Sequence, residues 1–137
     1  MKIAIRYYSK TGNTKKLADT IGAALKVEVQ DVSVPLTEDT DILFLGSSVY
    51  AAGVDQQIKD FIQNINVKVE KIVNFSTAAL LPSTYPQIKK LLAAKGFVIS
   101  EDEFHCRGSF QMLHRGKPDV EDLKKAAEFA KRVVGDR

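Results

Sequence analysis

The chain has 137 residues, of which 45% are hydrophobic and 27% charged, with a formal net charge of +3. This size and balance predict one globular domain over residues 1–137, with a core large enough to fold alone. The sequence contains no apolar run near the roughly 20 residues that cross a bilayer, and it does not begin like a signal peptide. We therefore expect a cytoplasmic protein that makes no contact with membranes. The mild, dispersed charge does not favour nucleic acid, and a single cysteine, Cys106, excludes an internal disulfide and any multi-cysteine metal site.

The first elements predict a strand, a helix and a second strand. Residues 3–8 form a short apolar run rich in β-favouring side chains, which predicts a strand. Apolar side chains recur at helical spacing through residues 14–25, and residues 27–32 alternate as a half-buried edge strand does. Residues 33–40 are too few for a full helix, so we expect a turn or a single helical turn there.

The middle of the chain predicts two buried strands around a helix. Residues 42–46 are continuously apolar, which is typical of a strand covered on both faces. Residues 54–65 carry an apolar stripe at helical spacing, and residues 71–75 predict the fourth strand.

The end of the chain predicts two helices around one broken strand. Residues 83–96 begin with hydroxyl residues that can cap a helix, and they end with a glycine. Residues 97–99 and 104–110 predict the last strand, in two pieces. A final helix is expected to open at Pro118.

Strands that alternate with helices predict an α/β fold with three layers, a doubly wound five-stranded parallel sheet covered by helices on both faces. The strand order is left open between a flavodoxin-like order and a truncated Rossmann order. In either case ligands bind outside the carboxyl ends of the strands. The segments to inspect are therefore 9–14, 47–54 and 76–83.

The first of these segments has the features of a phosphate site. Its hydroxyl groups are donors, Gly12 lets the backbone turn with its N–H groups inward, and the helix near Thr14 adds free N–H groups and a positive dipole end. Together these groups suit a phosphate dianion. The alternative is a simple polar turn with a helix cap. The candidate residues are Ser9, Lys10, Thr11, Gly12, Asn13 and Thr14.

The same residues carry a family resemblance. Residues 7–14 look like the phosphate loop of flavodoxins and related FMN proteins, and residues 44–50 resemble their second flavin loop. The similarity continues through residues 104–108 to the last helix, in the short-chain form of the family. It implies FMN as cofactor and the strand order 2-1-3-4-5. Walker and Rossmann glycine motifs are missing from the sequence, and the acidic residues of a response-regulator receiver do not stand at the expected strand ends.

The resemblance also assigns the other two segments. Residues 47–53 would run along the flavin ring with Tyr50 stacked on it, unless Tyr50 only packs the start of the next helix. Residues 76–78 would meet the pyrimidine edge of the ring, unless they only form a capping turn. The residues so assigned are Ser47, Ser48, Val49, Tyr50, Ala51, Ala52, Gly53, Ser76, Thr77 and Ala78.

The resemblance implies an FMN-bound redox protein that passes electrons to or from a partner protein. We expect a monomer or weak dimer that binds neither nucleic acid nor metal, with the chemistry carried by the flavin rather than by a catalytic side chain. The alternatives are a small-substrate flavin oxidoreductase, of the quinone reductase or protoporphyrinogen oxidase type, and a non-redox module of the same fold. Electron-carrier flavodoxins are strongly acidic, whereas this chain is slightly basic.

Overall fold

The structure, a computed structural model, describes residues 1–49, 54–78, 83–108 and 116–135. Strands and helices alternate through the described chain, with one helix fewer than strict alternation would give. In order they are β1 (Ile3–Tyr7), α1 (Asn13–Leu25), β2 (Val29–Asp31), β3 (Thr40–Val49), α2 (Gln56–Gln63), β4 (Val69–Ala78), α3 (Tyr85–Ala94), β5 (Phe104–Arg107) and α4 (Val120–Gly135).

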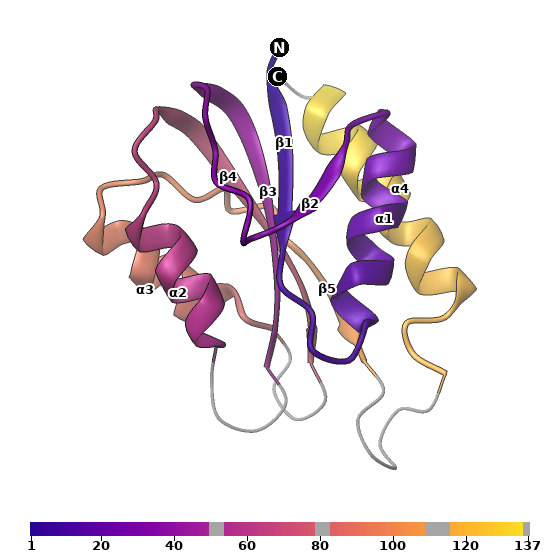
Figure 1. The fold of residues 1–137 in the computed structure, drawn as a ribbon. Coiled ribbons are helices and arrows are strands. Elements are labelled where there is room, and N and C mark those ends of the chain that lie inside the picture. The colour runs from indigo at the N-terminus through magenta and orange to yellow at the C-terminus, as the bar shows by residue number, and fades with distance from the viewer. Residues whose placement is uncertain (50–53, 79–82, 109–115, 136–137) are drawn as a thin grey trace.

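The five strands form one sheet in the order β2-β1-β3-β4-β5, and every neighbouring pair is parallel. This confirms the flavodoxin-like order and excludes the Rossmann order. Figure 1 shows α1 and α4 on one face of the sheet and α2 and α3 on the other. Because all strands point the same way, their carboxyl ends meet at one edge of the sheet, at the bottom of Figure 1.

Two apolar layers hold the helices to the sheet. Successive side chains of a strand point to opposite faces, so β3 gives Phe44 to the layer under α1 and α4 and Leu45 to the layer under α2 and α3. Gly46 has a packing role, because a Cβ atom there would lie 2.3 Å from the Phe75 ring. The glycine therefore lets the fully buried Phe75 fill the space between β3, β4 and the α1–α4 layer.

The sequence placed the ends of three strands wrongly. Apolar runs predicted β3 at 42–46 and β4 at 71–75, but both strands continue for three more residues at their carboxyl ends. The additional residues are mainly serine and threonine, and the sheet ladder still pairs them from Ser47–Ser76 to Val49–Ala78. Strand β2 is shorter than predicted. The split of the last strand is confirmed, because an isolated bridge joins Ile72 to Ile99 ahead of β5.

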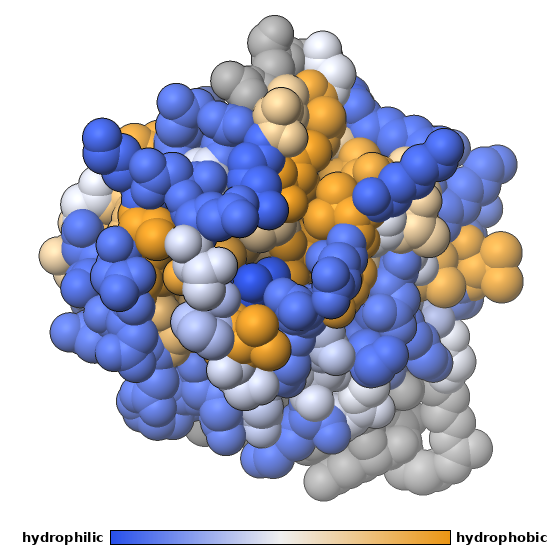
Figure 2. Space-filling view, turned by 45° about the horizontal axis from the view of Figure 1, so that its top comes forward, coloured by the Kyte–Doolittle hydropathy of each residue, from blue (hydrophilic) through white to orange (hydrophobic). Residues whose placement is uncertain are grey.

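The connection between β2 and β3 contains no helix, as its length predicted. Within the described part of the chain, no helix is both long enough and apolar enough to cross a membrane. The face shown in Figure 2 is mostly hydrophilic, with hydrophobic residues in a hollowed strip near its centre and in smaller separate spots.

Candidate functional site

The turn between β1 and α1 is held by a glycine in the left-handed region. Gly12 has φ 91°, a value that side chains other than glycine rarely adopt. Its N–H donates to the Ser9 hydroxyl at 2.9 Å, and its carbonyl accepts the first helical hydrogen bond, from the Lys16 N–H at 3.1 Å. The turn is thus closed on itself and leads directly into α1, as the sequence predicted.

The start of α1 provides a positive environment. The first-turn N–H groups of a helix have no acceptors within the helix, and its dipole is positive at this end. The first turn of α1 contains no acidic residue, and no Asp or Glu occurs in residues 1–18. Lys10 and Thr11 are exposed beside it, while Asn13 is buried. These groups fit a phosphate, because a helix N-terminus favours negative charge and the sequence around the turn contributes no carboxylate.

Thr14 has a different role from the one its hydroxyl suggested. The side chain is fully buried, and its Oγ1 donates to the Ser47 carbonyl at 3.3 Å. The same oxygen lies 2.9 Å from the Thr77 Oγ1. Since the single Thr14 proton goes to Ser47, Thr77 is the donor in the shorter bond. The Thr14 hydroxyl therefore ties the start of α1 to the ends of β3 and β4.

The second predicted segment begins inside the sheet. Ser47 and Ser48 are buried in β3. The Ser47 Oγ donates to the Thr84 Oγ1, at 2.8 Å, on the α2–α3 face of the sheet. Val49 ends the strand. Residues 50–53, which include the Tyr50 predicted to stack on the ring, lie outside the described residues, so that assignment stays a prediction.

The third predicted segment is the end of β4. Ser76, Thr77 and Ala78 are fully buried, and they line up in register with the end of β3. The Ser76 Oγ accepts from the Thr84 N–H at 3.3 Å and thereby fixes the start of α3. The described parts of all three predicted segments therefore lie at the carboxyl edge of the sheet.

A chain of buried polar side chains continues from this edge, and sequence reasoning missed it. Asn74 is fully buried, and its Nδ2 donates to the Thr84 Oγ1 at 3.1 Å. Ser83 caps the start of α3 by accepting from the Tyr85 N–H, and its Oγ donates to Glu103 at 3.0 Å. An asparagine within the apolar run 71–75 was the available signal, because a buried amide needs partners.

The polar chain ends at the half-buried Glu103, just before β5, and the exposed His105 on that strand. The second Glu103 oxygen lies 2.6 Å from the His105 Nδ1, so Glu103 joins the start of α3 to β5. In the described ranges, no three His, Cys, Asp or Glu side chains gather closely enough to share a metal ion. Burial raises the pKa of the neighbouring Cys106 thiol to about 12, with Asp122 adding to the effect. Cys106 is thus protonated at neutral pH and is not a thiolate redox group.

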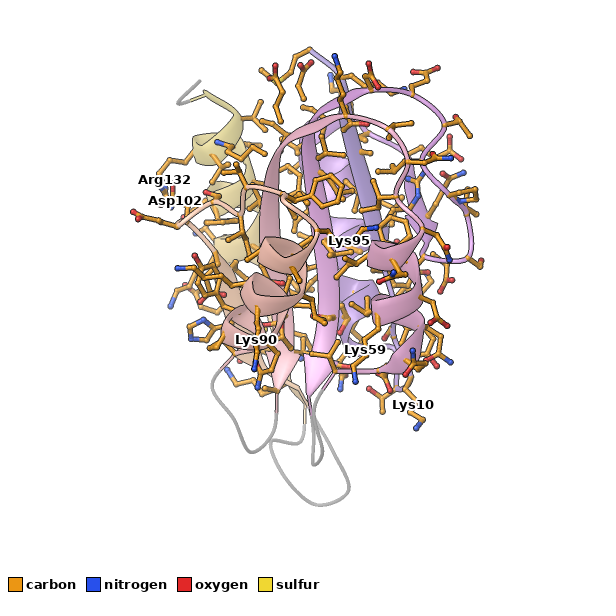
Figure 3. The ribbon with its side chains drawn as sticks, turned by 90° about the vertical axis from the view of Figure 1, so that its left-hand side faces the viewer. Lys10, Lys59, Lys90, Lys95, Asp102 and Arg132 are labelled. Atoms are coloured by element: carbon orange, nitrogen blue, oxygen red, sulfur yellow. The ribbon has the colours of Figure 1, made fainter. Side chains whose placement is uncertain are left out.

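Lysines lie on the loop side of the molecule. Figure 3 shows Lys10, Lys59 and Lys90 toward the end where the strands lead into loops, with Lys95 further from it. No Asp or Glu occurs in residues 42–54 or 71–100. The turn before α1 and the ends of β3 and β4 therefore lack carboxylates of their own, which favours an anionic ligand between them.

Comparisons with known proteins agree with this geometry. Residues 4–113 match the family model described as Flavodoxin domain. An uncharacterized protein of Methanocaldococcus jannaschii is 32% identical over 149 residues, covering 98% of this chain and 99% of that protein.

Two solved structures share the fold at lower identity. A flavodoxin from the domain Archaea superposes with a TM-score of 0.81 at 17% identity, covering 99% of this chain and 98% of that one. Flavodoxin 1 of Bacillus cereus gives a TM-score of 0.74 at 19% identity, with 98% of each chain covered. The family match spans most of the chain, and the strand order agrees with it. The chain therefore belongs to the flavodoxin domain family.

Proposed function

We propose that the chain binds FMN at the carboxyl edge of its sheet and exchanges electrons with a partner protein. FMN is the cofactor of the family to which the chain belongs. The observation that supports the proposal most strongly is the closed turn at Gly12, which leads directly into the N-terminus of α1 in a stretch, residues 1–18, that contains no Asp or Glu. Such a turn suits the phosphate of FMN, which riboflavin lacks.

In this proposal the six residues from Ser9 to Thr14 hold the phosphate in two ways. The backbone N–H groups of the turn and of the first turn of α1, with the Ser9 and Thr11 hydroxyls, are the donors. Thr14 acts indirectly, because its buried hydroxyl fixes the start of α1 against β3 and β4. Residues 47–53 would line the flavin ring and residues 76–78 its pyrimidine edge.

FMN, when bound, supplies one-electron and two-electron chemistry, and the chain supplies binding, orientation and electrostatics. The buried hydroxyls of Ser47, Ser76 and Thr77 hold β3, β4 and the start of α3 in one arrangement beneath the ring segments. These buried bonds fix the strand ends from which the ring segments continue. A fixed base for the flavin favours electron exchange with a partner over the closing motions that many substrate-specific enzymes use.

The test is a direct comparison of electron acceptors. The FMN-loaded protein is reduced and mixed by stopped flow with cytochrome c, and separately with a soluble quinone. We expect transfer to the protein acceptor to be dependent on salt, because charged surfaces guide the encounter. Saturable steady-state turnover with the quinone alone would instead support the small-substrate oxidoreductase. A protein that binds no flavin would be the non-redox module.

A further inference from the structure

On the α2–α3 face of the sheet, one of the connections between parallel strands contains no helix. A connection between parallel strands is usually an α-helix, but residues 32–39 pass from β2 to β3 without one. Two of their side chains, Val32 and Leu36, are buried in the same apolar layer as Phe61 of α2. This connection therefore covers the sheet next to α2 with two side chains in place of a helix.

Arg6 holds the connection in place. The side chain rises from β1 and is only 8% exposed, and its Nε donates to the Val34 carbonyl at 2.8 Å. Its Nη2 donates to the Pro35 carbonyl at 3.3 Å. Burial lowers the pKa of the guanidinium, against an opposing contribution from Glu28, but an arginine stays charged in proteins. The bonds from a charged donor make the connection a fixed wall.

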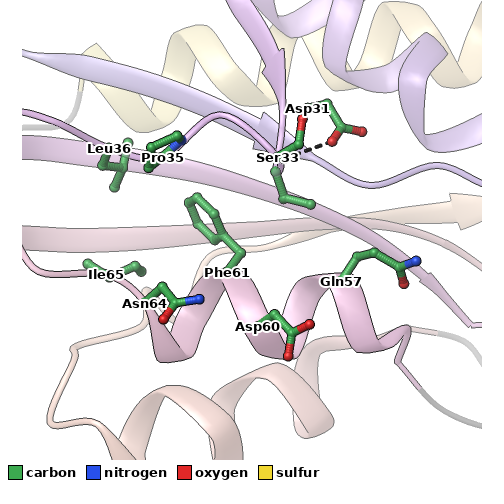
Figure 4. Close-up of a pocket in the computed structure, with 10 residues that line it drawn as sticks. Asp31, Ser33, Pro35, Leu36, Gln57, Asp60, Phe61, Asn64 and Ile65 are labelled. Carbon is green, nitrogen blue, oxygen red and sulfur yellow. Dashed lines mark hydrogen bonds between the residues drawn. The ribbon is translucent and has the colours of Figure 1, made fainter.

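A groove lies between this wall and α2 (Figure 4). Its volume is about 350 Å³, and we call it the α2 groove. Helix α2 contributes Gln57, Asp60 and Phe61, and Asn64 follows at its C-cap; these residues share one side of the helix because they are spaced three or four residues apart. The groove therefore follows α2 for about 10 Å. The remaining lining residues are Asp31, Val32, Ser33, Pro35, Leu36 and Ile65.

The lining combines an apolar floor with negative charge. It includes the carboxylates of Asp31 and Asp60 and no basic side chain. Each carboxylate has one oxygen engaged with a neutral donor of the protein, the Ser33 N–H and the Gln56 Nε2 respectively. Two nearby lysines point away from the groove. Lys95, at the C-cap of α3, donates to the Gln63 carbonyl, and Figure 3 shows Lys59 on the side of α2 next to α3.

We propose that the α2 groove docks a partner protein through a large apolar side chain flanked by lysine or arginine. The apolar floor takes the side chain, and the two carboxylates attract the flanking cations and reject an acidic surface. Because Arg6 already holds the connection between β2 and β3 in place, docking loses little conformational entropy in the groove. The exposed Val34 on the connection extends the apolar contact outside the groove.

The groove lies beside the candidate flavin site. Asp31 pairs in register with Tyr7, two residues before the turn at Ser9, and Gln57 is in the first turn of α2. A partner docked there would be close to the loops at the carboxyl edge. The groove is lined by described residues alone, so the inference stands whether or not FMN binds.

The experiment titrates the ¹⁵N-labelled protein with a five-residue peptide that has one tryptophan between pairs of lysines. A matched peptide has glutamates in place of the lysines. We expect the lysine peptide to shift the amide signals of residues 31–36 and 57–65. The glutamate peptide should bind with an affinity at least fivefold lower. Tryptamine is titrated in parallel as a small organic cation.

Two double variants separate the groove from general charge. The variant with both Asp31→Asn and Asp60→Asn keeps both hydrogen-bond acceptors but removes both charges. It should bind the lysine peptide with an affinity that is lower by about fivefold or more. Glu101→Gln with Glu128→Gln makes the same change of net charge at exposed positions outside the groove lining, and it should leave the affinity unchanged. Equal binding of both peptides, equal effects of both variants, shifts outside the groove, or tryptamine binding as tightly as the peptide would each overturn the proposal.

Discussion

Replacing Gly12 by alanine isolates the contribution of backbone conformation to the site. A Cβ atom at this position would meet nothing within 4 Å, so the substitution introduces no clash. The φ of 91° nevertheless lies in the left-handed region, where an L-residue costs about 1–2 kcal/mol. If the variant keeps this conformation, the cost lowers its free energy of unfolding. If the turn instead changes conformation in the free protein, the cost is avoided there.

If the turn relaxes in the free variant, FMN binding must restore its left-handed conformation. The cost of that conformation then lowers the affinity for FMN. We expect the decrease in stability and the loss of FMN binding free energy to add to about 1–2 kcal/mol, equivalent to roughly 5- to 30-fold in affinity if all of it falls on binding. Riboflavin, which has no phosphate for the turn to hold, should lose less. Urea unfolding of the apoprotein and fluorescence titration with both flavins measure the two quantities.

Gly96→Ala is the matched control. Gly96 has φ 79° and open space for a Cβ atom, but it lies at the opposite end of α3 from the candidate site. It should lower stability by a similar amount and leave FMN affinity unchanged. The reasoning is refuted if Gly12→Ala changes neither stability nor affinity, or if Gly96→Ala weakens FMN to the same extent.

The remaining predictions concern hydroxyls, the thiol and the flavin potential. Thr14→Val should lower the free energy of unfolding by about 1–3 kcal/mol, because it removes the bonds from α1 to β3 and β4. Thr11→Ala should instead weaken FMN binding, by about 1.5–3 kcal/mol. Denaturation and flavin titration measure the two effects, and the reasoning is wrong if Thr11→Ala leaves FMN affinity unchanged or Thr14→Val leaves stability unchanged. Cys106, with its pKa raised to about 12, should react slowly with maleimide at pH 7 and faster with each unit of pH, because the thiolate fraction rises steadily below the pKa. Rapid labelling at pH 7 would contradict the raised pKa. The potential for the second flavin electron should be less negative than in acidic flavodoxins, because residues 47–53 and 76–85 contain no Asp or Glu. One carboxylate at about 10 Å, with a dielectric near 20, contributes about 1.7 kcal/mol, or roughly 70 mV. A spectroelectrochemical titration measures this potential. A value as low as in the acidic carriers would contradict the prediction and would mean that desolvation by the apolar ring segments determines the potential.

The sheet and its order could be predicted because local patterns and topology rules agree. Apolar runs and helical spacing predicted every strand and helix of the described chain, and the family resemblance chose between the two strand orders. Gly12 was recognisable as a backbone requirement, since a tight turn between a strand and a helix needs a residue that tolerates positive φ.

The hydroxyl network was beyond sequence reasoning. Ser47, Ser76 and Thr84 look like loop and cap residues in isolation, but they are buried because each hydroxyl finds its partner on another element. For the same reason β3 and β4 extend past their apolar runs. The Thr14 hydroxyl pointed to a ligand in sequence, whereas its partners are Ser47 and Thr77, which are 33 and 63 residues away.

The groove beside α2 also depends on the tertiary structure. The shortness of residues 33–40 was visible in the sequence, but no pattern indicated that the Arg6 side chain would fix them or that α2 would face them across a hollow. Groups far apart in sequence meet there only when the sheet has formed.

The most direct test of the account compares the affinity of the apoprotein for FMN with its affinity for riboflavin. Both affinities are measured by the quenching of flavin fluorescence. One hydrogen bond to a charged phosphate oxygen contributes about 1.5–3 kcal/mol, so the turn at Gly12 should make FMN at least about 10-fold tighter than riboflavin. Equal affinities, or no binding of either flavin, would contradict the assignment of residues 9–14 as the phosphate site.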